Sequence, residues 1–152
     1  DKDSSLKLIN STLSANTDDD MYATLDIEIL DLYNGNMEFI KNSACPTYVK
    51  RGKDVQLLKS MTLPTGILND VDLVVYDYDL QDGDILVMCT DGVIDSNKEY
   101  VNKQLWLKYL LEDIEVTDAQ KIADIIIREA IDNDYGNPKD DMSIIVARIT
   151  RK

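Results

Sequence analysis

The sequence predicts an α+β fold, because the expected strands and helices are segregated along the chain. One short helix is followed by five or six short strands, then by two helices and a final strand. This order is typical of mainly antiparallel sheets with helices on their faces, and it fits either two stacked sheets or one large sheet. At 152 residues the chain has the length of one domain, and we interpret residues 1–152 as a single domain.

The first helix and the first hairpin follow from hydrophobic periodicity and turn residues. Residues 5–13 place three apolar side chains on one helical face: Leu6, Ile9 and Leu13. Within residues 22–31 three apolar side chains alternate with polar ones, which predicts a strand with one buried face: Leu25, Ile27 and Ile29. The dipeptide Asn34-Gly35 favours a tight turn, so an antiparallel strand is expected at residues 37–40.

The later elements are predicted from the same signals. Further strands are expected at residues 47–50, 55–58, 72–77 and 142–149. The uninterrupted apolar run at residues 85–89 predicts a strand that is buried on both faces. A helix is expected over residues 101–111, with Trp106 and Tyr109 in the core. A second helix is expected to start at Thr117, where the spacing is that of a capping box.

The charge of the chain argues against contact with nucleic acid or membranes. The formal net charge is −13 at pH 7, and no cluster of basic residues is denser than Lys50-Arg51. Such a surface repels phosphate backbones and anionic lipids. No apolar run reaches the ~18 residues of a membrane-spanning helix, and the first residues lack the pattern of a signal peptide. We therefore expect a cytoplasmic chain that makes no membrane contact.

The absence of histidine restricts the chemistry that the chain can perform. It excludes Ser-His-Asp and Cys-His nucleophile systems and the common zinc sites. Cys45 and Cys89 lie in apolar, strand-like surroundings, which is typical of reduced, buried thiols, with a disulfide as the alternative. An enzyme of this composition has to use carboxylates, Lys, Tyr, Cys or a bound metal.

Two acidic positions stand at the ends of predicted strands. Asp91 follows the apolar run and precedes Gly92, while Asp140 and Asp141 precede the last strand. Carboxylates that converge from neighbouring strand ends form an oxygen-rich site suited to Mg²⁺ or Mn²⁺, and a glycine beside them lets backbone or ligand come close. The alternative is that these positions are ordinary turns, as we expect for Asp82-Gly83.

Four segments occur in an order that resembles a known family. They are YATLD at residues 22–26, LPTGI at 63–67, GDILVMCTDG at 83–92 and KDDMSIIVAR at 139–148. Together they resemble the later two thirds of the stage II sporulation protein E-type catalytic domain. That domain belongs to the sporulation branch of the PPM (protein phosphatase 2C-like) serine/threonine phosphatases. The resemblance extends from about Leu6 to Arg148.

The resemblance implies an α-β-β-α sandwich, in which two mainly antiparallel sheets are flanked by helices. It also implies two metal ions, Mn²⁺ or Mg²⁺, in the complete domain. By motif, Asp91 matches the metal aspartate of the family's Ser/Thr-Asp-Gly segment, and Asp140 matches that of its Asp-Asn/Asp-Met-Ser/Thr segment. In the family the metals activate a water that attacks phosphoserine or phosphothreonine without a phosphoenzyme. No catalytic residue beyond the metal-bound water is expected.

The chain departs from the family at the family's first metal motif, an Asp-Gly-Met-Gly segment on an early strand. No Asp-Gly occurs before residue 82, so Asp91 and Asp140 would form half of a site. We therefore expect an N-terminally truncated domain with little or no activity alone. Parent proteins in this branch are often membrane-anchored through a separate region.

The resemblance also implies a partner. The expected substrate is a phosphoprotein of the anti-anti-sigma factor type, whose dephosphorylation promotes sigma-factor activation during sporulation; a homo-oligomer is an open alternative for the assembly. The alternative function is a non-catalytic, phosphatase-like module for protein–protein contact or oligomerisation. The coding sequence upstream of Asp1 distinguishes the two, because an Asp-Gly-Met-Gly segment there favours the enzyme.

Overall fold

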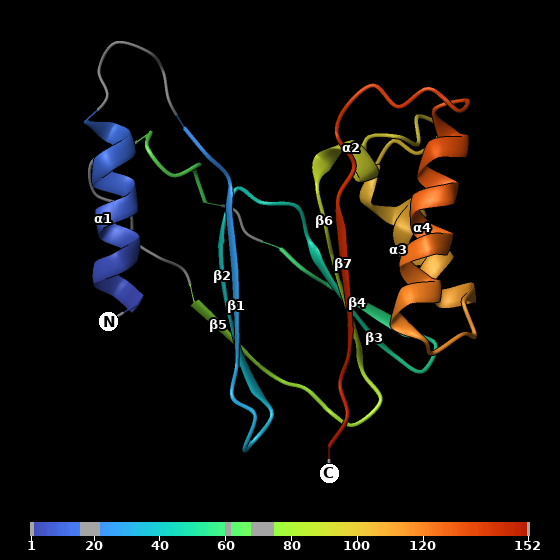
Figure 1. The fold of residues 1–152 in the computed structure, drawn as a ribbon, viewed down its shortest axis with the longest axis horizontal. Helices are drawn as coiled ribbons and strands as arrows, with labels where there is room; N and C mark the ends of the chain where they lie inside the picture. Colours follow the sequence, from blue (N-terminus) through green and yellow to red (C-terminus); the bar gives the residue numbers. More distant parts are fainter. Residues whose placement is uncertain (1, 16–21, 60–61, 68–74, 152) are drawn as a thin grey trace. The chain divides into compact units, whose positions relative to one another are not determined.

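A computed structural model describes residues 2–15, 22–59, 62–67 and 75–151 of the chain (Figure 1). The chain forms two compact units, and each is considered by itself. The first unit comprises Asp1–Ala44 and Lys59–Asp79, and the second comprises Cys45–Leu58 and Leu80–Lys152. None of the helices in the described ranges is long and apolar enough to cross a membrane.

The first unit contains a helix and a three-stranded antiparallel sheet. The helix α1 spans Lys2–Ser14, and the sheet has the order β1-β2-β5, with strand bounds Leu25–Leu30, Asn36–Asn42 and Val75–Asp79. The predicted hairpin is confirmed, because β1 and β2 pair antiparallel and Gly35 has a φ of 78° in the turn. Of the strand predicted at residues 72–77, residues 72–74 lie outside the described residues, and β5 continues to Asp79.

Two apolar residues of the first unit are exposed although the sequence predicted their burial. Ile29 is 41% exposed, and its strand β1 shows no alternation of buried and exposed residues. In α1, Ile9 is 42% exposed, and the buried positions are Leu6 and Asn10. The Asn10 Oδ1 accepts a hydrogen bond from the N–H of Gly66 at 2.9 Å. An amide therefore occupies the inward position that the hydrophobic pattern assigned to Ile9.

The second unit contains a four-stranded antiparallel sheet with the order β4-β3-β6-β7. The strands are β3 (Thr47–Arg51), β4 (Asp54–Leu58), β6 (Ile85–Cys89) and β7 (Ile144–Arg148). Three helices lie between β6 and β7 in the sequence: α2 (Asp91–Ile94), α3 (Gln104–Asp113) and α4 (Ala119–Asn133). Helices α3 and α4 cover one face of this sheet (Figure 1). Two antiparallel sheets with accompanying helices confirm the predicted α+β class.

The core of the second unit lies between its sheet and its helices. Its buried side chains come largely from β6, α3 and α4: Ile85, Val87, Trp106, Leu107, Ile122 and Ile126. The predicted burial of β6 is confirmed at its first three residues, whereas its last two are half-buried. The prediction for Trp106 is confirmed, but that for Tyr109 is wrong. Tyr109 is 45% exposed, and its ring packs beside that of Tyr100 with the centroids 6.0 Å apart.

In the second unit, α3 and α4 both begin later than the sequence predicted. Helix α3 begins at Gln104 rather than at residue 101, and the side chain of Asn102 accepts a hydrogen bond from the Gln104 N–H at 3.3 Å. Helix α4 is capped by Asp118 rather than by Thr117, because the Asp118 carboxylate accepts from the N–H of Lys121 at 2.9 Å. An aspartate one position further along therefore replaces the predicted capping box.

Candidate metal centre

The C-terminal end of β6 lies beside the N-terminal end of β7, and the segments that carry Asp91 and Asp140 meet there. Thr90 joins these segments through three hydrogen bonds. Its N–H donates to the Ser143 carbonyl at 3.1 Å, and its hydroxyl accepts from the Ser143 N–H at 3.0 Å. The same hydroxyl donates to the carbonyl of Asp141 at 3.2 Å. The two segments are thus held together beyond the last paired residues of the strands.

Gly92 lies against the backbone of the second segment. A Cβ atom at this position would be 2.4 Å from the carbonyl oxygen of Asp141 and 3.4 Å from the carbonyl carbon of Asp140. The glycine is therefore required by space, and Gly92 is not among the glycines with a positive φ. The expectation that this glycine permits a close backbone approach is confirmed. It places Asp91 and Asp140 on adjacent segments of chain.

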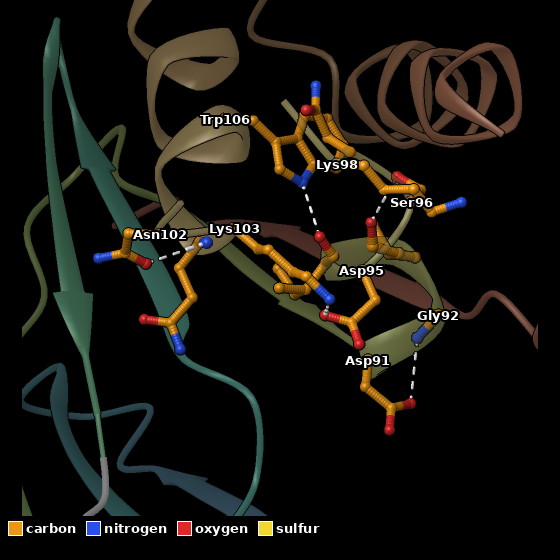
Figure 2. A network of polar contacts seen from close by, with 12 residues as sticks. Asp91, Gly92, Asp95, Ser96, Lys98, Asn102, Lys103 and Trp106 are labelled. Carbon is orange, nitrogen blue, oxygen red and sulfur yellow. Dashed lines mark hydrogen bonds and ion pairs between the residues drawn. The ribbon is translucent and has the colours of Figure 1, made fainter. Parts of the chain in front are cut away.

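The two candidate carboxylates are exposed, and each accepts a hydrogen bond from the next residue. Asp91 Oδ1 accepts from the N–H of Gly92 at 3.0 Å (Figure 2). Asp140 Oδ1 accepts from the N–H of Asp141 at 2.8 Å. Asp91 is the first residue of α2 rather than part of a simple turn. Within the described ranges neither carboxylate forms an ion pair with a basic side chain.

The chemistry of these donors fits a hard divalent cation. Carboxylate oxygens are the ligands that Mg²⁺ and Mn²⁺ prefer in proteins. The missing Cβ of Gly92 allows both carboxylate-bearing segments to approach the same place. In the part of the chain that the structure describes, no group of three or more His, Cys, Asp or Glu side chains is placed to hold a metal ion. The pair therefore offers part of a coordination shell, and its role as a metal site stays a prediction.

Helix α2 is fixed from the side opposite to the Asp91 carboxylate. The indole Nε1 of Trp106 donates to the carbonyl of Ile94 at 3.0 Å, and Trp106 itself is buried in the core. Lys103 pairs with Asp95 at 3.0 Å on the exposed side of the same helix. Figure 2 shows these contacts together, with the Asp91 carboxylate pointing away from Trp106. A core residue thus positions the helix whose first residue is Asp91.

Sequence reasoning missed the part that Thr90 plays. Its only signal in the sequence was a β-branched hydroxyl residue directly after a buried strand, and that pattern fits many turns. The contacts of Thr90 depend on the pairing of β6 with β7, whose residues lie more than 50 positions apart in the chain. Only the folded register reveals them.

Asp82, which we interpreted as a turn residue, lies at the other end of β6. Gly83 has a φ of 85°, as expected for a glycine in a tight turn. The exposed Asp82 accepts a hydrogen bond from the N–H of Arg151 at 2.9 Å. The interpretation as a turn is confirmed, so Asp82 is a suitable control for experiments on the candidate metal centre.

Cys89 ends β6, two residues before Asp91, and a thiol nucleophile could be imagined there. The residue is half-buried and packs against the core of the second unit, and neither cysteine is in a disulfide. We expect Cys89→Ser or Cys89→Ala to leave turnover within a few-fold of the parent, because no histidine is present to take the thiol proton. Steady-state phosphopeptide kinetics test this, with circular dichroism as the folding control. Complete loss of turnover in a folded variant would show that the thiol is essential.

The sequence matches the family model described as stage II sporulation protein E over residues 1–150. Stage II sporulation protein E of Bacillus subtilis (strain 168) is 38% identical over 149 residues, which are 98% of this chain and 18% of that protein. The protein of the same description from Priestia megaterium is 35% identical over 144 residues, 95% of this chain and 25% of that protein. The chain thus spans a quarter or less of the length of these curated relatives.

Solved structures from Bacillus subtilis match over the same range. The PP2C phosphatase domain of the cell fate determinant SpoIIE, solved with a fragment of its regulatory domain, matches with a TM-score of 0.91 and 37% identity, covering 100% of this chain and 46% of that one. The phosphatase domain of the same protein, described as Mn presoaked, matches with a TM-score of 0.80 and 35% identity, covering 100% and 68%. These matches confirm the fold that the sequence motifs implied.

Proposed function

Because this chain belongs to the stage II sporulation protein E family, we propose that it carries part of the active site of a PP2C-type protein serine/threonine phosphatase. The proposal concerns the complete gene product, in which residues 1–152 supply Asp91 and Asp140 to a metal centre. The fold match to the phosphatase domain from Bacillus subtilis over the whole of this chain supports it.

The observation that carries the proposal is the contact between Gly92 and Asp141. It brings two carboxylate-bearing segments together at one end of a rigid pair of strands. Two independent turns exposed to solvent would accept a side chain at this position. At Gly92, by contrast, a Cβ atom would lie only 2.4 Å from the carbonyl oxygen of Asp141. Within the described ranges neither exposed carboxylate has a basic partner, so a cation shared by the two segments would be the group that neutralises them.

We assign Asp91 and Asp140 as ligands of a shared Mn²⁺ or Mg²⁺ ion, within a centre of two ions in the complete domain. Such a centre, when loaded, supplies an activated water and neutralises charge on the phosphoryl group. The described residues position the ligands. Thr90 and Gly92 hold the two segments together, and Asp91 and Asp140 supply the negative charge that a cation requires. The manganese-presoaked structure of the Bacillus subtilis domain supports the choice of ion.

The substrate that we propose is a phosphoprotein carrying phosphoserine or phosphothreonine. Membership of a sporulation family supports a more specific substrate, a phosphorylated anti-anti-sigma factor, whose dephosphorylation would promote sigma-factor activation. A chain with a net charge of −13 does not attract a phosphorylated protein by itself. Metal ions and local basic side chains therefore have to provide the attraction.

We expect the complete gene product to release phosphate from a phosphoserine peptide only when Mn²⁺ or Mg²⁺ is present. Residues 1–152 alone should release little or none, because their described part places no group of three metal-binding side chains together. The measurement is phosphate release as a function of Mn²⁺ concentration for both proteins, with samples that contain a metal chelator as the metal-free control.

Two outcomes would change the proposal. Robust Mn²⁺-dependent hydrolysis by residues 1–152 alone would show that Asp91 and Asp140 are not half of a site. A complete gene product that is folded and binds metal, yet does not hydrolyse any phosphopeptide, would favour a non-catalytic interaction module. The coding sequence upstream of Asp1 gives an independent test, through the presence of an Asp-Gly-Met-Gly segment.

A further inference from the structure

A pocket in the second unit lies at the end of β6 opposite to the candidate metal centre. It has a volume of about 290 Å³ and is lined by residues of β3, the β3–β4 turn, the start of β6 and the end of α3. Lys50, which lines the pocket, is the register partner of Ile85, the first residue of β6. Asp91, by contrast, lies beyond the last residue of that strand. A ligand in this pocket would therefore occupy a second site.

The lining contains a buried lysine. The side chain of Lys50 is 6% exposed, and its Nζ donates to the carbonyl of Leu111 at 2.7 Å. This carbonyl belongs to the last turn of α3, where backbone acceptors lack partners within the helix. A lysine ammonium group has three N–H donors, yet Lys50 forms no ion pair with any residue that the structure describes. The buried charge is thus held by one neutral acceptor.

A buried ammonium group without an anionic partner is costly, because it loses hydration without gaining an opposite charge. Burial lowers the pKa of Lys50, as expected for such a group. An anion held in the pocket would supply the missing negative charge and accept the remaining N–H groups of the amine. Lys50 is therefore a suitable anchor for the negatively charged end of a ligand.

The other residues of the lining restrict the charge of that ligand. Two carboxylates, Glu112 and Glu115, line the pocket together with a second amine, that of Lys53. With Lys50 included, the formal charges of these four side chains cancel. A phosphate or a nucleotide brings two or more negative charges, which the carboxylates would repel. The lining therefore favours a ligand with a single negative charge.

The same lining offers apolar surface for the body of the ligand. Ile85 and Ile114 are buried apolar side chains, and Val116 adds an exposed one. Mainly apolar walls with a few polar groups that fix orientation are typical of small-molecule sites. An anion with an aliphatic group thus fits this pocket better than a fully polar anion.

We propose that the pocket binds a small molecule with one carboxylate and an aliphatic group, the carboxylate lying against the amine of Lys50. The carboxylate accepts charge-assisted hydrogen bonds from that amine, and the aliphatic group packs against Ile114 and Val116. The ligand is either a simple aliphatic acid or an apolar amino acid, whose ammonium group would face Glu112 or Glu115. The inference goes beyond the proposed function, because it assigns a second ligand and requires no phosphatase activity.

Four probes with related branched skeletons test the chemistry: isovalerate, leucine, isovaleramide and isopropylmalonate. Binding to the complete gene product is measured by saturation-transfer difference NMR in metal-free buffer, so that carboxylates do not report on the metal centre. We expect isovalerate, leucine or both to bind. Isovaleramide should bind at least about tenfold more weakly than the better of the two, because it lacks the charge. Isopropylmalonate should also bind more weakly, since its second carboxylate meets Glu112 and Glu115.

Three variants assign the binding to this pocket. Lys50→Met keeps an unbranched side chain but removes the charge, and it should weaken carboxylate binding by at least about tenfold. Val116→Asp places a negative charge on the pocket wall at an exposed position, so it should weaken binding without disturbing the core. It also tests the inference if Lys50→Met does not fold. Lys121→Met is the matched control, because Lys121 is an exposed lysine of α4 outside the lining.

The relative affinities of two probes identify the ligand class. Tighter binding of leucine assigns an amino acid, and isovalerate binding at least as tightly assigns a simple acid. The inference is overturned if isovaleramide or isopropylmalonate binds as tightly as the better of these two. It is also overturned if a folded Lys50→Met or Val116→Asp binds like the parent, or if Lys121→Met shows an equal loss. If no probe binds, Lys50 serves only the last turn of α3. None of these results depends on turnover, so they are distinguishable from a failure of the phosphatase proposal.

Discussion

Replacing either Asp91 or Asp140 with asparagine is expected to reduce phosphopeptide hydrolysis by at least about 100-fold in the complete gene product. Asparagine keeps the size of the side chain but removes the negative charge that a divalent cation requires from its ligand. Each variant should also need a higher Mn²⁺ concentration for half-maximal activity. Phosphate release across a Mn²⁺ titration measures both effects for each single variant.

The double variant tests whether the two carboxylates act on one ion. If they share a metal, removing the second ligand should cost much less than removing the first, so the two losses should not add. Asp82→Asn is the matched control, because Asp82 is an exposed aspartate before a glycine, at the far end of β6. Its activity should stay close to that of the parent. Near-normal activity in either metal-site variant, or a large loss at Asp82, would refute the assignment.

Elements with strong local signals could be predicted from the sequence. The Asn34-Gly35 hairpin and the turn at Asp82-Gly83 were predicted because few residues other than glycine adopt the required φ angles, which are 78° and 85° here. The strand β6 was predicted because a strand that is buried on both faces carries no polar side, and its first three residues are buried. In each case the physical cause lies within a few residues of sequence.

Elements that depend on tertiary contacts could not be predicted in the same way. The inward position of α1 carries Asn10, because the N–H of Gly66, 56 residues away, needs an acceptor. Helix α3 starts at Gln104 instead of residue 101, and the N–H of Gln104 donates a hydrogen bond to the side chain of Asn102. Hydrophobic patterns contain no information about such polar partners, so Ile9 and residues 101–103 were assigned wrongly.

The candidate site shows the same division. The meeting of the segments that carry Asp91 and Asp140 could be predicted, because strand ends and an adjacent glycine are visible in the sequence; their role as metal ligands stays a prediction. The part that Thr90 plays could not be predicted, since its three hydrogen bonds arise only when β6 and β7 pair in the observed register. The ion pair between Lys98 and Asp134 likewise depends on the position of the end of α4. Local sequence thus identifies candidate ligands more readily than the contacts that position them.

The second large effect is expected at Gly92. In Gly92→Ala the new methyl group would meet the carbonyl oxygen of Asp141 at 2.4 Å, well inside any normal contact. The two segments must then move apart, and backbone on both sides resists that movement. We expect the free energy of unfolding to fall by about 1–3 kcal/mol. Chemical denaturation of parent and variant measures this change.

The movement should also separate the two carboxylates of the candidate metal centre. We therefore expect the Mn²⁺ concentration for half-maximal activity to rise by about tenfold or more in Gly92→Ala, since ligand geometry must be held to within ~0.5 Å. Gly52→Ala is the matched control. Gly52 lies in the β3–β4 turn with a φ of 61°, and a methyl group there would meet no atom within 4 Å. Its cost is therefore backbone strain alone, about 1–2 kcal/mol.

The comparison separates stability from the metal centre. Both glycine variants should be less stable than the parent, but only Gly92→Ala should change the response to Mn²⁺. If Gly52→Ala shifts the Mn²⁺ titration equally, the shift reports general destabilisation and not the geometry of the site. If Gly92→Ala is destabilised yet keeps the parent's Mn²⁺ response, Asp91 and Asp140 do not depend on the close contact at Gly92. The contact would then serve packing alone, and the main structural support for a shared metal would be lost.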